Sequence, residues 1–374
     1  MGTRDRDKRG KRVIDQVRVR VLSIPTDQPE ADGTLAWSNT TMIVVEVDSG
    51  GCHGLGFTYS DGSAARLIKH TLAPVLVGKD AAAPQAATAV LRRQVRNVGR
   101  SGIAACAISA LDIALWDLKA RLLDMPLVTL LGQRRDAATI YGSGGFTTYD
   151  DPTLQAQLAN WVETDGCNAV KIKIGTDPQA DPHRVAMARQ AIGSAALYVD
   201  ANGAFTPRAA LRMAEQLAEY DISWFEEPVS SDDLVGMAFV RSRIGPKIDI
   251  AAGEYSFTID DTRHMLQAGA TDVQQIDITR CGGVTGFLQA AAICDAYHVD
   301  VSAHCAPSAH CHVVCAAPRF RNLEWFHDHV RIEQQLFDGA PRARGGTVTP
   351  DLSRPGHGLT LREKEAQAYA VNSD

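Results

Sequence analysis

Three acidic residues recur along the chain at a spacing that could bring their carboxylates together. Asp200, Glu226 and Glu254 each follow a short apolar run and lie 26 and 28 residues apart. Three carboxylates held in one place would repel one another and raise their pKa values unless a cation neutralised them. Hard oxygen ligands of this kind suit Mg²⁺. The alternative, that each acid caps a helix or pairs with a surface arginine, explains any one of them more easily than all three at equivalent positions.

Two lysines precede this acidic series, at the end of the apolar run before it. In Lys171-Ile172-Lys173 the period-two alternation of a strand directs both lysines to the same side. Two close ammonium groups disfavour each other's protonation, so we expect the pKa of at least one to be lowered toward that of a useful base. A Lys-x-Lys pair alone is also typical of solvated lysines, and its position just ahead of the acids favours a catalytic interpretation.

A second acid–base pair is expected later in the chain. Asp277 and His304 lie 27 residues apart, each at the end of an apolar run. A carboxylate one strand over from an imidazole can hold its tautomer and raise its basicity, whereas a lone buried histidine is more often a core residue. Glu324 ends a further run. If protonated it could donate a hydrogen bond to a developing oxyanion, and its alternative role is a salt bridge with Arg319 or Arg321.

The elements that must position these residues are repeated strand–helix units. From about residue 138, short apolar runs alternate with helical stretches, which predicts an α/β fold with a parallel sheet. The expected strands are 139–142, 169–174, 197–201, 223–226, 248–252, 273–278, 299–304 and 322–326. Eight strands at this pitch predict a closed (β/α) barrel, in which reactive groups lie at the C-terminal ends of the strands.

The first 130 or so residues have a different pattern. Alternating valines at 17, 19 and 21 and a β-branched run at 42–47 predict antiparallel strands, separated by a polar loop over 26–39. Helical periodicity follows at 65–77, 86–95 and, most clearly, 104–123. We therefore expect an α+β domain at 1–135, a catalytic barrel at 136–338 and a C-terminal segment at 339–374 that returns to the first domain.

Composition excludes several classes of function. Acidic residues outnumber basic ones by 44 to 38, so no global positive charge favours nucleic acid. No apolar run reaches the roughly 18–20 residues that cross a bilayer, and the charged residues at 4–12, expected to form a solvated tail, do not resemble a secretory signal. The eight cysteines have irregular spacing, typical of free thiols. We expect a cytoplasmic protein with neither a nucleic-acid nor a membrane partner.

Together these motifs resemble the enolase superfamily, specifically its mandelate racemase-like subgroup, the mandelate racemase/muconate lactonizing enzyme family. The resemblance spans nearly the whole chain and implies a modified (β/α)8 TIM-type barrel with an N-terminal α+β capping domain. The motifs that carry it are Lys171-x-Lys173, Asp200-x-Asn202, Glu226-Glu227-Pro228, Gly253-Glu254, Asp277 with Gly282-Gly283, His304 and Glu324.

The resemblance also implies a role for each residue. One Mg²⁺ would be bound by Asp200, Glu226 and Glu254. Lys173 and His304 would be acid/base catalysts on opposite faces of the substrate, with Asp277 orienting His304. Lys171 would tune Lys173 and contact the substrate carboxylate. Asn202 would contact the substrate, and Glu324 would form a hydrogen bond with a carboxylate oxygen.

The implied chemistry is removal of a proton α to a carboxylate, which creates an enediolate that a metal and hydrogen-bond donors must stabilise. Loss of a β-hydroxyl then makes a dehydratase, and reprotonation on the other face makes a racemase or epimerase of a hydroxy or amino acid. Specificity is expected in the capping loops 26–39, with Trp37, and 57–63, with Tyr59 and Asp61. Their hydroxyl-rich surroundings favour dehydration of a sugar acid to a 2-keto-3-deoxy acid.

Two alternatives come from other classes. The Cys- and His-rich segment 304–315 could hold Zn²⁺ in a hydrolase or a structural site, but it lacks paired Cys-x-x-Cys spacing, and an apolar helix explains Cys311 and Cys315. A non-catalytic binding protein would lack a ligand or a base, and none is missing. The expected partner is a small-molecule carboxylate substrate, and family analogy suggests a homo-oligomer.

Overall fold

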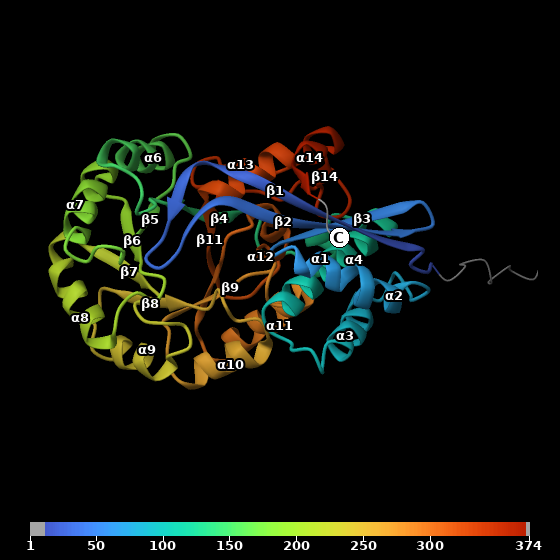
Figure 1. Cartoon of the computed structure of the whole chain (residues 1–374), viewed down its shortest axis with the longest axis horizontal. Helices are drawn as coiled ribbons and strands as arrows, with labels where there is room; N and C mark the ends of the chain where they lie inside the picture. Colours follow the sequence, from blue (N-terminus) through green and yellow to red (C-terminus); the bar gives the residue numbers. More distant parts are fainter. Residues whose placement is uncertain (1–11, 372–374) are drawn as a thin grey trace, which may run out of the picture.

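Eight parallel strands form a closed barrel in the computed structural model, which describes residues 12–371 (Figure 1). The order runs from β4 through β11, and β11 pairs back with β4. All eight expected strands are present, with ends within two residues of the predicted positions. The solvated tail expected at 4–12 lies outside the described residues, except for Arg12. The strands are β4 (Ala138–Gly144), β5 (Ala169–Lys173), β6 (Ala196–Asp200), β7 (Ile222–Glu226), β8 (Asp249–Ala252), β9 (Val273–Ile276), β10 (Asp300–Ala303) and β11 (Phe320–Phe326).

Helices follow the barrel strands and cover the outside. Several begin at a polar cap directly after a loop: Asp150 accepts a hydrogen bond from the Thr153 N–H, and Thr258 forms a capping box with Asp261. Such caps satisfy N–H groups that the first turn leaves unpaired. The helices are α6 (Asp151–Glu163), α7 (Asp181–Ile192), α8 (Pro207–Gln216), α9 (Leu234–Arg241), α10 (Ile259–Gln267), α11 (Gly283–Ala296), α12 (Pro307–Val314) and α13 (His327–Leu336), with a 3₁₀ turn at Ala218–Tyr220.

Strand alternation separates the barrel core into an outer and an inner set. On β5, β6 and β7 the outward residues Ile172, Val199 and Phe225 are fully buried in the hydrophobic layer beneath the helices. Their neighbours point into the barrel, because successive side chains of a strand face opposite ways. The same alternation that builds the core therefore directs polar strand-end residues to the barrel mouth.

The N-terminal unit packs a four-stranded sheet, in the order β15-β1-β2-β3, against a long helix. Gly54, on β3, lies so close to this helix that a Cβ there would be 2.2 Å from the carbonyl oxygen of Ala114. The elements are β1 (Gln16–Ala31), β2 (Ala36–Ser49), β3 (Cys52–Tyr59), α1 (Ser63–Leu67), a π-helical turn (Ile68–Leu72), α2 (Ala73–Leu76), α3 (Pro84–Gln94), α4 (Ile103–Leu122) and α5 (Leu127–Leu131).

The expected polar loop at 26–39 is wrong, because β1 and β2 continue through it as a hairpin with its turn at 32–35. A register shift between Pro25 and Glu30 absorbs the irregular sequence, and the Asp32 carboxylate accepts the backbone N–H groups of Thr34 and Leu35 at the tip. The polarity of this segment reflects an exposed strand face rather than a loop. The hairpin reaches across to the barrel near β5 and β6 (Figure 1).

The C-terminal segment crosses from the barrel to the N-terminal sheet. β13 (Thr347–Val348) pairs with β4, β14 (Thr360–Leu361) pairs with β12 (Phe337–Asp338), and β15 (Ala370–Val371) follows α14 (Glu363–Tyr369) and pairs with β1. We propose that the division at 135 and 338 describes the domains. Within residues 12–371, no helix has the length and apolar character that crossing a membrane requires.

Candidate active site

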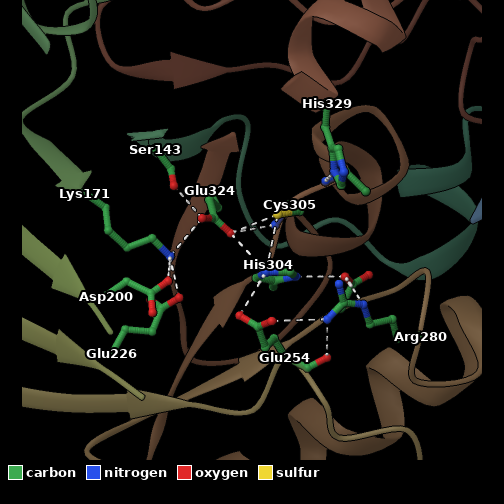
Figure 2. A network of polar contacts seen from close by, with 12 residues as sticks. Ser143, Lys171, Asp200, Glu226, Glu254, Arg280, His304, Cys305, Glu324 and His329 are labelled. Atoms are coloured by element: carbon green, nitrogen blue, oxygen red, sulfur yellow. Dashed lines mark hydrogen bonds and ion pairs between the residues drawn. The ribbon is translucent and has the colours of Figure 1, made fainter. Parts of the chain in front are cut away.

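Three carboxylates converge at the C-terminal end of the barrel strands. Asp200 ends β6, Glu226 ends β7, and Glu254 lies two residues beyond β8. One oxygen from each lies within 4.8 Å of the other two. All three residues are buried, with at most 4% of their surface exposed. The residues expected to be metal ligands therefore share one place (Figure 2).

Both lysines of β5 point at these carboxylates (Figure 2 shows Lys171). The Nζ of Lys171 is 2.5 Å from Glu226 Oε1 and 2.8 Å from Glu324 Oε1, and the Nζ of Lys173 is 2.6 Å from Asp200 Oδ2. The expected lowering of a lysine pKa is wrong for this arrangement. Burial disfavours both ammonium groups, but the carboxylates around them outweigh it and raise the pKa of each lysine.

The donor set fits a divalent cation. Burial, together with the charge of Asp200, raises the pKa of Glu226 to about 8. Burial and Glu254 also raise the pKa of the adjacent Glu227, whose Oε1 is buried without a hydrogen-bond partner. Buried carboxyl groups this close together remain ionised only if positive charge lies beside them. Three buried carboxylate oxygens are the ligand type that Mg²⁺ prefers.

His304 faces the same carboxylates from the other side. It lies just beyond β10, and its Nδ1 is 2.8 Å from Asp277 Oδ2, while its Nε2 is 3.3 Å from Glu254 Oε2. Burial disfavours the imidazolium, but Cys305 and the surrounding carboxylates outweigh it and raise the pKa of His304 well above its ordinary value. Burial alone would raise the pKa of Asp277, but the hydrogen bond with His304 and the charge of Arg280 outweigh it and lower this pKa. The imidazole is thus held in one orientation and favoured in its charged form.

Glu324 is an acceptor and not the protonated donor that the sequence suggested. Its Oε1 accepts from Ser143 Oγ at 2.6 Å, and its Oε2 accepts from the Cys305 N–H at 3.0 Å (Figure 2). Although burial opposes ionisation, Lys171 and His304 lower the pKa of Glu324. The alternative salt bridges are also wrong, because Arg319 pairs with Asp300 and Arg321 with Asp249.

Sequence reasoning missed two residues at the centre of this network. The Nη1 of Arg280 is 3.4 Å from Glu254 Oε1, and its Nε is 3.5 Å from Asp277 Oδ2. Its position in the loop that follows β9, at the C-terminal end of the barrel, could have identified it. Cys305 places its Sγ 3.3 Å from His304 Nε2 and 3.2 Å from Glu324 Oε2. A buried cysteine after a histidine carries no signal of its own, so the thiol is visible only in the structure.

A cavity of about 410 Å³ opens above the network and is lined by both parts of the chain. Trp37 donates its indole N–H to Glu30, and Tyr59 donates its hydroxyl to Glu333, so both offer the cavity mainly their rings. Asn202 differs, because its Oδ1 is buried without a hydrogen-bond partner. The other lining residues are Asp32, Leu35, Asn39, Thr40, Thr41, Ser60, Asp61, Lys173, Glu254, Tyr255, Arg280, His304, Cys305, Glu324, Phe326 and His329.

The Cys- and His-rich segment does not form a zinc site around Cys311 and Cys315. Both are buried with α12 in the hydrophobic core, and in residues 12–371 neither belongs to a group of potential metal ligands. The Nε2 of His310 accepts from the Ile278 N–H, and the Nδ1 of His312 accepts from the Val128 N–H. The apolar-helix interpretation accounts for Cys311 and Cys315, whereas His304 and Cys305, at the start of the segment, form a group of potential metal ligands with Glu324.

Comparison with known proteins agrees with this geometry. Residues 16–132 match the model described as mandelate racemase / muconate lactonizing enzyme, N-terminal domain, and residues 153–365 match that described as enolase C-terminal domain-like. The chain is 32% identical to 3,6-anhydro-alpha-L-galactonate cycloisomerase of Streptomyces coelicolor, over 96% of this chain and 100% of the relative.

Two solved structures extend the comparison. A mandelate racemase/muconate lactonizing enzyme-like protein from Rubrobacter xylanophilus superposes with a TM-score of 0.94 at 47% identity, covering 96% of this chain and 100% of that one. L-Talarate dehydratase from Polaromonas sp. JS666, complexed with Mg and L-glucarate, gives a TM-score of 0.84 at 29% identity, covering 96% and 98%.

Proposed function

Because this chain belongs to the mandelate racemase/muconate lactonizing enzyme family of the enolase superfamily, we propose that it dehydrates a sugar acid by removing the proton α to the carboxylate. One observation carries this proposal. Lys173, on β5, and His304, beyond β10, line the same cavity and contact the carboxylate cluster from different strands. A substrate bound at the cluster would have a potential base and a potential acid beside it.

The ligands of a magnesium ion would be Asp200, Glu226 and Glu254. When bound there, the ion supplies positive charge beside the substrate carboxylate, where negative charge develops as the α-proton leaves. The Polaromonas dehydratase, with its Mg and its sugar acid, supports this assignment. Once engaged as a ligand, Asp200 no longer neutralises Lys173. The pKa of that lysine then falls toward the range of a base.

Each of the other residues has a step that follows from its contacts. Lys173 Nζ takes the α-proton, and the Lys171 ammonium donates to an oxygen of the resulting enediolate. His304, kept charged and oriented by Asp277, gives its proton to the β-hydroxyl as the carbon–oxygen bond breaks and water leaves. The enol that remains tautomerises to a 2-keto-3-deoxy acid. Ser143 and the Cys305 N–H hold Glu324 beside these reacting groups.

A second candidate is isomerisation of a cyclic sugar acid. The full-length similarity to a 3,6-anhydro-galactonate cycloisomerase favours it. In such a substrate the oxygen at the β-carbon belongs to a ring ether, so the same α-proton removal and β-elimination would open the ring without releasing water. The same side chains would act, and only the leaving group would differ.

A screen in D₂O distinguishes these reactions. The Mg²⁺-loaded protein would be incubated with a library of linear and 3,6-anhydro sugar acids, and 2-keto acid formation, product mass and deuterium at the α-carbon would be read together. A keto acid lighter by one water indicates dehydration, and a keto acid isomeric with its substrate indicates ring opening. Deuterium in recovered substrate without keto acid would indicate a racemase or epimerase.

Two lysine variants show whether the signals of the screen depend on the proposed active site. Lys173→Ala should lose every signal, whereas Lys247→Ala, at a lysine whose side chain is 85% exposed, should keep them. If no sugar acid formed a keto acid with the Mg²⁺-loaded protein, the proposed function would be wrong.

A further inference from the structure

A group of potential metal ligands outside the active site lies where the N-terminal sheet meets the barrel. Asp27 and Glu30 belong to β1, and His327 is the first residue of α13, which lies beside β1 (Figure 1). One ligand atom from each lies within 4.8 Å of the other two. The Nε2 of His327 is 2.9 Å from Asp27 Oδ2. None of the three has a part in the chemistry described above.

Glu30 is the unusual member of this group. The residue has no exposed surface, and while its Oε2 accepts the Trp37 indole N–H at 2.7 Å, its Oε1 is buried without a hydrogen-bond partner. A buried carboxylate oxygen without a partner is costly. Glu30 Oε1 is therefore placed to bind a positively charged or hydrogen-donating partner.

Two negative charges of this group, those of Asp27 and Glu30, are not matched by neighbouring cations in the described part of the chain. Asp328 accepts from Thr40 Oγ1 and from the guanidinium of Arg331, whose Nε is 3.1 Å away, so its charge is already matched. Asp27 and Glu30 are then left with one imidazole between them, which is neutral when it acts as a ligand. Two carboxylates and a neutral imidazole are balanced by a doubly charged cation.

We propose that Asp27, Glu30 and His327 form a second cation site, which takes a divalent first-row transition-metal ion such as Mn²⁺ and links β1 to α13. Carboxylate ligands suit Mn²⁺, and a histidine ligand distinguishes such an ion from Mg²⁺ or Ca²⁺, which prefer oxygen alone. Because Oε2 of Glu30 is taken by Trp37, the unpartnered Oε1 is the oxygen free to bind the ion.

The position of the site gives the ion a role at the cavity. Trp37, which Glu30 holds, lines the cavity, and so does Phe326, the residue before His327. An ion bound here fixes the turn end of the β1–β2 hairpin to the first residue of α13. It stabilises the closed arrangement of the two parts without touching the reacting groups.

The chain offers a matched control. His183 and Asp151 form a similar pair on the outside of the barrel, with Nε2 2.8 Å from Oδ2. Among the described residues, no third ligand joins this pair in a metal-binding group. His327→Gln should therefore remove a metal site, whereas His183→Gln should remove only a surface ion pair.

The experiment uses full-length protein stripped of metal and titrated with Mn²⁺, with free Mn²⁺ counted by electron paramagnetic resonance. The wild type and His183→Gln should bind two ions, and His327→Gln one. Pulsed resonance adds a distinct readout, because ¹⁴N modulation from an imidazole should be present in the wild type and absent in His327→Gln. The all-carboxylate site at the barrel mouth gives no such signal.

Glu30→Gln removes the buried carboxylate charge and so tests whether Glu30 binds the ion. Its amide oxygen can still accept from Trp37, so the thermal midpoint in metal-free buffer should be retained, while the increase in midpoint on adding Mn²⁺ should be smaller than in the wild type. Equal stoichiometry in the wild type and His327→Gln, or nitrogen modulation that survives in His327→Gln, would overturn the proposal.

Discussion

The inward-facing side chains of the barrel form two layers, which lie two residues apart along the same strands. The lower layer, the aromatic floor, is made of rings, and the upper layer, the mouth, is made of charged groups. The lower layer holds the rings of Tyr141, Tyr198 and Trp224, with the last two stacked at 4.8 Å. The upper layer, one inward position further along β6 and β7, holds Asp200 and Glu226. Strand alternation alone puts the aromatic floor and the charged mouth in register.

The difference separates what stabilises the fold from what performs the chemistry. The floor removes large aromatic surfaces from water, which favours folding. The mouth buries several charges, which opposes folding unless each is matched. The floor also supports the mouth, because Trp224 donates its indole N–H to Glu226 Oε2 at 2.9 Å and the Lys171 ammonium lies 5.4 Å from the centre of the Tyr141 ring.

The largest effect is expected from removing the acid or the base of the mouth. Lys173→Ala and His304→Ala should each lower kcat by about 10²–10⁴-fold or more, since each removes a group that moves a proton. Circular dichroism should show an unchanged fold, because the aromatic floor is intact. If either variant kept a kcat within a few-fold of the wild type, its residue would not be a proton-transferring group of the reaction.

A substitution in the floor should have the reverse outcome. Trp224→Ala is expected to lower the free energy of unfolding by roughly 3–5 kcal/mol, because it leaves a cavity and removes a donor from Glu226. Denaturant titration measures this loss. Trp224→Phe keeps most of the ring volume and should lose less. A Trp224→Ala protein as stable as the wild type would mean that the floor does not carry the stability assigned to it.

The two layers should also differ in their response to pH. In metal-free protein the pKa of Glu226 is raised to about 8, so its stabilising contribution is full below its ordinary pKa near 4.5 and is lost as the pH rises through 8. Glu226→Gln should therefore gain stability relative to the wild type between pH 6 and 9, by on the order of 1–3 kcal/mol. Denaturation in EDTA measures the difference. A difference that did not change with pH would contradict this account.

The smallest effect is expected where the hairpin meets the mouth. A Cβ on Gly33 would lie 2.4 Å from the Ala201 carbonyl oxygen and 2.6 Å from that of Ile174, so Gly33→Ala must displace the tip of the hairpin. Because the tip closes the cavity but adds little to the core, KM should rise a few-fold, while the free energy of unfolding changes by less than about 1 kcal/mol. Steady-state kinetics together with denaturant titration test this. Loss of stability without a change in KM would contradict it.

Much of the architecture was predictable because it depends on local periodicity. The eight barrel strands and the convergence of Asp200, Glu226 and Glu254 follow from alternation and from the regular spacing of strand ends. Apolar patterning does not depend on distant partners, so single-sequence reasoning can recover it. The hairpin over 26–39 was missed because its exposed strands carry the polar residues that are also typical of a loop.

The electrostatics of the site were less predictable, since they depend on residues far apart in sequence. Lys171 and Lys173 were expected to repel each other, but their nearest partners are Glu226, Glu324 and Asp200, which come from other strands. Cys305 likewise becomes recognisable as part of the site only through its contacts with His304 and Glu324. A pKa follows the complete surroundings of a group, and these exist only once the barrel has closed.

The most direct test of the account is a crystal structure of the protein grown with Mn²⁺ in place of Mg²⁺, with anomalous differences measured. The account predicts an anomalous peak bonded to Asp200, Glu226 and Glu254, with Lys173 released from Asp200 toward the cavity. If the space between the three carboxylates held no anomalous peak and both lysines kept their present partners, the central claim would be contradicted.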